Sequence, residues 1–110
     1  MSVDLDASCE PVARTLNHRR GERFEARTAD MLTLDYAAMA DGLVVNTSCE
    51  HLPNFKEWLA LVKPGTKLVL QSNDYFREPD HASCFATLAA FRDAAGLSHL
   101  AFAGDRKSVV

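Results

Sequence analysis

The sequence predicts an α/β protein with a mainly parallel sheet. Short apolar runs typical of strands alternate with longer stretches of helical periodicity along most of the 110 residues. Parallel strands need long crossover connections, which helices of this length supply. The composition is that of an ordinary globular protein, with 47% hydrophobic and 25% charged residues. We expect one domain over residues 1–104, followed by a non-native or disordered tail at residues 105–110.

Local signals set the predicted order of elements. Ser8 and Asn54 are suited to cap the starts of helices, and Gly21 and Gly96 to end them. The β-branched run Leu43–Val45 is typical of a buried strand. The predicted strands lie at residues 1–5, 24–28, 43–45, 67–71 and 99–103. The predicted helices lie at 9–20, 55–62 and 82–95, and a turn at 29–32 leads into a short helical stretch that ends at residue 39.

Charge and cysteine content exclude several classes of protein. The net charge is −3 and the chain carries no basic run, so we expect no nucleic-acid partner. The sequence has no segment of about 20 apolar residues to span a membrane, and its acidic start does not resemble a signal peptide. The three cysteines are odd in number and lack CxxC spacing, which favours a reducing compartment. We therefore expect a cytoplasmic location.

Polar side chains follow each of the first four predicted strands. Asp4 and Asp6 end the first strand, Asp30 follows the second, and the loops 46–51 and 72–74 follow the third and fourth. In open parallel sheets, ligands bind beyond the carboxyl ends of the strands. A purely structural sheet also needs polar loops, so this pattern alone indicates a site without defining it.

The order of these signals resembles that of the class I S-adenosylmethionine-dependent methyltransferases. The matching strings are Val3-Asp4-Leu5-Asp6, Thr28-Ala29-Asp30-Met31, Leu43–Leu52 and the Pro-Gly turn with its strand at Val62–Leu70. The resemblance as a whole, through the order and spacing of the predicted elements, covers almost everything from residue 3 to about residue 104. The resemblance implies a Rossmann-like three-layer sandwich, S-adenosylmethionine as cofactor, and in-line methyl transfer to an unknown, small-molecule acceptor.

The resemblance also implies roles for residues at the first two strand ends. Asp4 would accept hydrogen bonds from the ribose hydroxyls while Leu5 packs on the adenine. Asp30 would accept from the adenine amino group while Met31 packs against the ring. Two alternatives stay open: Asp6 is a competitor of Asp4 that instead caps the next helix, and Asp30 serves only to start a helix.

The loop after the third strand is the candidate catalytic loop. Glu50 or His51 would deprotonate or orient the acceptor, and Asn46 would present its amide oxygen to an acceptor amine. A hydrolase with Cys49 as nucleophile and His51 as base is an alternative. A metal site formed by these two residues with Glu50 and His81 lacks recognisable ligand spacing, so we expect no metal. The simplest alternative makes Cys49 a packing residue and His51 a helix cap.

The sequence departs from the family pattern in three places. It has no glycine-rich loop after a first strand, and the family's closing antiparallel hairpin is cut short after Ala103. It also lacks the Asn-Pro-Pro-aromatic string of the amino-methylating subgroup. We expect a gene fragment whose incomplete sheet exposes inner edges and can self-associate through them. The rival functions are a nicotianamine-synthase-like aminopropyl transferase and an inactive truncated domain that only self-associates.

Overall fold

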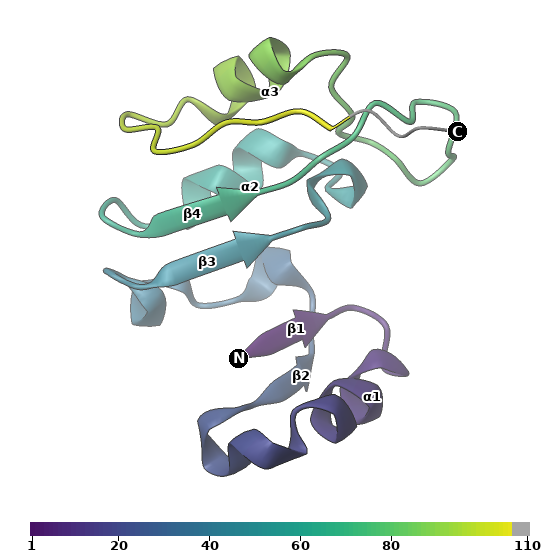
Figure 1. Ribbon diagram of the computed structural model, residues 1–110, viewed down its shortest axis with the longest axis vertical. Coiled ribbons are helices and arrows are strands. Elements are labelled where there is room, and N and C mark those ends of the chain that lie inside the picture. Colours follow the sequence, from purple (N-terminus) through teal and green to yellow (C-terminus); the bar gives the residue numbers. More distant parts are fainter. Residues whose placement is uncertain (107–110) are drawn as a thin grey trace. The chain divides into compact units, whose positions relative to one another are not determined.

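The computed structural model describes residues 1–106 and divides the chain into two compact units, Met1–Tyr36 and Ala37–Val110. Each unit contains two short parallel strands joined through a helix, so each is a βαβ unit (Figure 1). The predicted α/β class with parallel strand pairing is therefore confirmed. The described strands pair two by two, β1 with β2 and β3 with β4.

Helix α1 holds the first unit together. The elements of this unit are β1 (Ser2–Asp4), α1 (Cys9–Leu16), a 3₁₀ helix at His18–Arg23, β2 (Ala26–Thr28) and a 3₁₀ helix at Met31–Thr33. From α1, the Glu10 carboxylate accepts hydrogen bonds from the amide and hydroxyl of Thr28, and Arg14 donates to the carbonyl of Ala26. These contacts join α1 to β2, which pairs with β1 in the register Asp4↔Thr28.

The start and end of α1 differ from the prediction. The helix ends at Leu16 and not at Arg20, and the chain continues as 3₁₀ turns through Gly21, whose φ is +52°. Ser8 occupies the cap position without a side-chain capping bond. Instead, the carboxylate of Asp6 accepts a hydrogen bond from the Ser8 amide at 2.8 Å. Asp6 therefore forms the turn before α1, but it does not cap the helix, whose cap residue is Ser8.

The second unit has the same βαβ order with one more helix. Its elements are β3 (Leu43–Asn46), a 3₁₀ helix at Cys49–His51, α2 (Phe55–Leu61), β4 (Lys67–Leu70) and α3 (Leu88–Ala95), and a 3₁₀ helix at Tyr36–Met39 spans the boundary between the units. Asn54 caps α2 by accepting from the Glu57 amide, and Gly96 ends α3 with a φ of +57°, as predicted. Residues 82–87 are not helical, because Thr87 caps α3 and its hydroxyl accepts from Ala90. Residues 99–103 form no strand.

The core of the second unit is aromatic and surrounds Phe55. The Phe55 ring contacts the rings of Trp58, Phe85 and Phe91. Trp58 is 1% exposed, which confirms its prediction as a core residue. Burying large aromatic side chains contributes most of the stability that a small unit can obtain.

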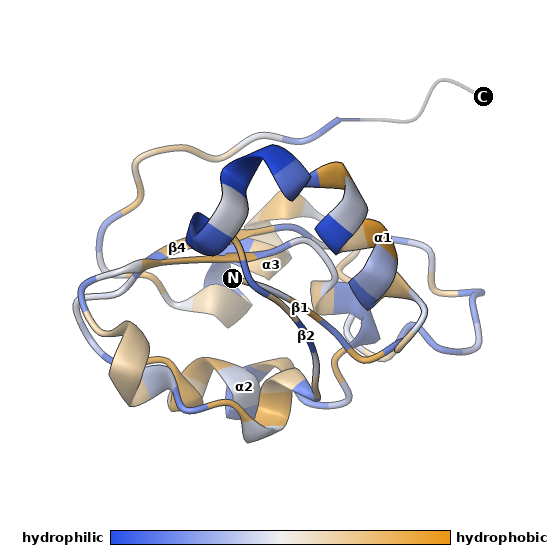
Figure 2. Ribbon diagram, turned by 90° about the horizontal axis from the view of Figure 1, so that it is seen from below, coloured by the Kyte–Doolittle hydropathy of each residue, from blue (hydrophilic) through white to orange (hydrophobic). Residues whose placement is uncertain are grey.

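The strands of the second unit are less buried than predicted. Leu43, Val45 and Val69 are each at least 50% exposed. In the parallel register Val45 lies opposite Val69, so these side chains share one face of the β3–β4 pair. The prediction of fully buried strands is therefore wrong for that face, although the strands are hydrophobic in sequence (Figure 2). Among residues 1–106, no helix is long and apolar enough to cross a membrane.

Candidate functional site

The two predicted cofactor-binding acids lie at the same end of the first strand pair. Asp4 is the last residue of β1 and pairs with Thr28, the last residue of β2, and Asp30 follows two residues later. Both carboxylates also shape their own turns. Asp4 Oδ1 accepts from the Asp6 amide at 2.9 Å, and Asp30 Oδ1 accepts from the Leu32 amide at 2.8 Å. Asp30 therefore starts a 3₁₀ helix, which agrees with the alternative that this residue serves to start a helix.

The side chains next to these acids differ in exposure. Leu5, after Asp4, is 73% exposed, whereas Met31, after Asp30, is partly buried. The Met31 carbonyl accepts a hydrogen bond from the buried Tyr36 hydroxyl at 2.8 Å. The strand end thus presents an exposed apolar side chain beside Asp4.

An open hollow of about 290 Å³ lies against α1 on the Asp4 side of the first unit. Its lining includes Cys9, whose thiol pKa is raised by partial burial and by the charges of Asp4 and Asp6. That thiol is protonated at neutral pH. Of the two predicted cofactor-binding acids, only Asp4 lines the hollow, and Asp30 does not.

The candidate catalytic loop of the second unit is fixed to the end of β4. The carbonyl of Asn46 accepts from the Gln71 amide, and the Gln71 carbonyl accepts from the Cys49 amide. Asn46 is 7% exposed, and its Oδ1 accepts from the Ser48 amide at 2.9 Å. The amide oxygen that was predicted to face an acceptor is therefore used to shape the loop.

Cys49 is a packing residue. Its side chain is fully buried and its thiol donates to the Asn46 carbonyl at 3.6 Å. Burial raises the pKa of the Cys49 thiol to about 12. A thiol with this pKa is not a nucleophile at neutral pH, which argues against the hydrolase alternative. His51 does not cap α2, because Asn54 does so.

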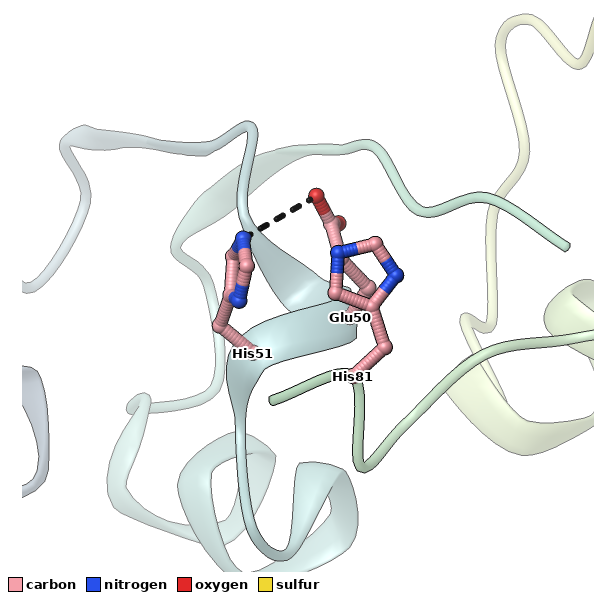
Figure 3. A group of neighbouring side chains, drawn as sticks. All are labelled: Glu50, His51 and His81. Atoms are coloured by element: carbon pink, nitrogen blue, oxygen red, sulfur yellow. Dashed lines mark ion pairs between the residues drawn. The ribbon is translucent and has the colours of Figure 1, made fainter. Parts of the chain in front are cut away.

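Glu50 and His51 gather with His81 in one cluster, which we call the Glu-His-His cluster (Figure 3). Each side chain offers one ligand atom, and these atoms lie within 4.8 Å of one another. His51 Nε2 and Glu50 Oε1 are 3.7 Å apart, and the two imidazole rings meet edge to face. Three of the four residues weighed for a metal site thus come together, although their sequence spacing gives no sign of it.

His81 lies in this cluster because hydrogen bonds from Ser83 join its segment to the loop that carries Glu50. Ser83 donates from its amide to the Glu50 carbonyl at 2.9 Å and from its hydroxyl to the Leu52 carbonyl at 2.7 Å. The His81 ring is held through Nδ1, 3.0 Å from the Tyr75 carbonyl. The sequence suggested His81 only as a member of the rejected metal site, since nothing local to residues 80–84 indicates contact with residues 50–52.

Cys84 lies beside His81 without forming a reactive pair. Its thiol donates to Asn73 Oδ1 at 3.3 Å and lies 3.6 Å from His81 Nδ1. The pKa of the Cys84 thiol is raised first by burial and then by the negative charges of Glu50 and Asp74. Burial and these charges favour the protonated thiol over the reactive thiolate.

The predicted tail is described only at its start. Asp105 and Arg106 are exposed and belong to no helix or strand. The rest of the predicted tail, residues 107–110, lies outside the described residues.

Comparison with protein-family models, with curated proteins and with solved structures found no significant match to this chain. The geometry of the two strand-end sites therefore carries the functional argument.

Proposed function

We propose that this chain is part of a class I S-adenosylmethionine-dependent methyltransferase with a small-molecule acceptor. The proposal includes a Rossmann-like three-layer sandwich to which both βαβ units belong. Its main support is the strand pairing. The family's sheet places strand three beside strand two, and strand four beside strand five, with strand one between the pairs. If β1 to β4 are the family's strands two to five, the pairs β1–β2 and β3–β4 are those that the family pattern requires.

The residues at the end of the β1–β2 pair fit the adenosine part of the cofactor. A carboxylate with two acceptor oxygens suits a cis-diol, and Asp4 retains acceptor capacity beyond its bond to the Asp6 amide. Leu5 is exposed enough to pack on a planar ring. Asp30 lies at the same end of the strand pair and would accept from the adenine amino group.

The loop after β3 would act on the acceptor. S-adenosylmethionine supplies an electrophilic methyl group on a sulfonium, which an acceptor displaces in line. Positioning provides most of the rate increase in such a reaction. Glu50 and His51 are the loop residues able to take the acceptor's proton, and the His51 side chain is 43% exposed and so accessible to a small molecule.

The cofactor assignment is tested by calorimetry. We expect the chain alone to bind S-adenosylmethionine weakly or not at all, because the glycine-rich loop that holds the amino-acid end is not in the sequence. A chain extended at its N-terminus by a family first strand and its glycine loop should bind. In that extended chain, Asp4→Ala should weaken binding by about 1–3 kcal/mol through lost hydrogen bonds to a charged group.

The matched control is Glu25→Gln, because Glu25 precedes β2 and so lies at the opposite end of the same strand pair. It should leave affinity unchanged. Tight binding by the bare chain, or an extended chain in which Asp4→Ala binds as well as the parent, would contradict the assignment. A loss with Asp6→Ala in place of Asp4→Ala would transfer the role to Asp6.

A further inference from the structure

The Glu-His-His cluster contains a buried carboxylate oxygen with no partner. Glu50 is only 9% exposed, and its Oε2 has no hydrogen-bond partner among residues 1–106. The other oxygen, Oε1, lies 3.7 Å from His51 Nε2, which is beyond hydrogen-bond length. A carboxylate buried without hydrogen bonds is unfavourable unless a charge compensates it. A cation bound in the cluster would supply that compensation.

The two imidazoles are oriented as metal ligands usually are. His81 Nδ1 lies 3.0 Å from the Tyr75 carbonyl, which can only accept, so this nitrogen carries the proton and Nε2 keeps its lone pair. His51 directs its Nε2 at Glu50, and its Nδ1 lies 3.6 Å from Asp80 Oδ2, which is also beyond hydrogen-bond length (Figure 3). Metal-binding histidines commonly direct their second nitrogen at a carbonyl or carboxylate, as His81 does.

The distances are close to those of a bound ion. Zinc bonds of about 2.0–2.2 Å in a tetrahedral arrangement place neighbouring ligand atoms roughly 3.3–3.5 Å apart. The His51–Glu50 pair at 3.7 Å needs a contraction of a few tenths of an ångström. The remaining separations are all within 4.8 Å, so the widest of them must shorten by more when an ion binds. Because the His51 side chain is 43% exposed, an ion can enter from solvent.

We propose that Glu50, His51 and His81 bind one divalent transition-metal ion. Two imidazole nitrogens and one carboxylate oxygen form the ligand set of catalytic zinc sites, so zinc is the ion we assign. Three protein ligands leave a fourth position open to water or to a substrate atom. This site uses only residues of the second unit and goes beyond the proposed methyl transfer, since it requires neither cofactor nor acceptor. With zinc bound, Glu50 and His51 are ligands and no longer take the acceptor's proton.

The test is metal binding by the full chain, without S-adenosylmethionine or acceptor. We expect the chelator-stripped protein to bind one Zn²⁺ by calorimetry, and Co²⁺ to give the visible absorption of a low-symmetry site. His81→Ala and Glu50→Gln should each lower the affinity more than about 100-fold, because losing a direct ligand exceeds the effect of losing a residue that only orients one. Zn²⁺ should raise the thermal midpoint of the wild-type protein and not that of His81→Ala.

The controls distinguish metal binding at the Glu-His-His cluster from metal binding elsewhere on the chain. His18→Ala and His99→Ala remove exposed histidines and should leave affinity unchanged. Cys9→Ser and Cys84→Ala test whether free thiols hold the ion, and both should bind as the parent does. His81→Cys supplies a different zinc ligand at the same position and should restore part of the affinity that His81→Ala loses.

Two results would overturn the proposal. One is a wild-type chain that binds no Zn²⁺, and the other is undiminished binding by His81→Ala whose circular dichroism matches the parent. If His81→Ala does not fold, His51→Ala gives the same test from the exposed side of the cluster. Neither result bears on the Asp4 calorimetry, so the two proposals can fail separately.

Discussion

The polar residues at the strand ends differ in hydrogen bonding and burial between the two βαβ units. In Met1–Tyr36, Asp4, Asp6 and Asp30 each accept a hydrogen bond from a nearby backbone amide at the surface. In Ala37–Val110, Glu50 follows β3 into the core and leaves one carboxylate oxygen without a partner among the described residues. Surface turns of the first kind cost little free energy, whereas a buried carboxylate oxygen without a hydrogen bond carries a stability penalty. Residues that are equally polar in the sequence can therefore differ in whether they indicate a functional site.

The largest expected difference between the units is in core packing. Leu52 is 2% exposed, whereas Leu16 on α1 is 77% exposed. Leu52→Ala should lower the free energy of unfolding by about 2–5 kcal/mol, while Leu16→Ala should change it by less than about 0.5 kcal/mol. Urea unfolding followed by circular dichroism and by the fluorescence of Trp58, the only tryptophan, measures both. Equal effects of the two substitutions would mean that the second unit has no better core than the first.

A smaller effect of opposite sign is expected at Glu50. In chelator-containing buffer at neutral pH, Glu50→Gln should raise the free energy of unfolding by about 1 kcal/mol, because it removes a buried charge that no hydrogen bond satisfies. The same urea titration measures it. A clear loss of stability would show that the Glu50 carboxylate is compensated in the metal-free protein, and would remove the contrast with the first unit.

The smallest effect concerns Glu10, an acidic residue on α1 in the first unit. Hydrogen bonds from the Thr28 hydroxyl, and then from Arg14, hold the pKa of Glu10 below its ordinary value of 4.5. Because the folded-state pKa is the lower one, this stabilisation is present above pH 4.5 and is lost as the pH falls through the folded pKa. The Thr28 amide, which donates to Glu10, should report the loss by its NMR shift and exchange rate in an acid titration.

The control for this titration is Glu10→Gln, which should flatten the acid dependence of the Thr28 amide. Glu25→Gln removes an exposed pair with Arg27 and should leave the dependence in place. A Thr28 amide that does not respond to acid would mean that Glu10 does not join α1 to β2.

Local sequence patterns predicted which helices and strands form better than they predicted how deeply those elements are buried. The strand at Leu43–Val45, the Asn54 cap and the Gly96 stop depend on neighbouring residues, and each is present. The exposed face at Val45 and Val69 was missed, because a β-branched run has the same sequence whether one face or both are covered. The helix predicted from residue 82 begins later, since Thr87 offers a cap that overrides the apolar periodicity before it.

The candidate site was predicted in part. Asp4, Asp30 and the loop containing Glu50 and His51 follow strands, and strand ends can be found from sequence. His81 could not be found in this way. It reaches Glu50 through a long-range fold contact, and ligand spacing in sequence reports only short-range arrangements. Ligand spacing in the sequence therefore could not indicate a cluster that includes His81.

The hydrogen bonds of Ser83 have a consequence for the order of folding. The bond from its hydroxyl to the Leu52 carbonyl joins residues 31 positions apart in the chain. Closing a loop of that length costs roughly 3 kcal/mol of chain entropy, which local contacts such as those within α2 do not incur. We therefore expect His81 to meet Glu50 late in refolding, after α2 has formed. Uptake of Co²⁺ during refolding would then report one of the last steps in the assembly of this unit.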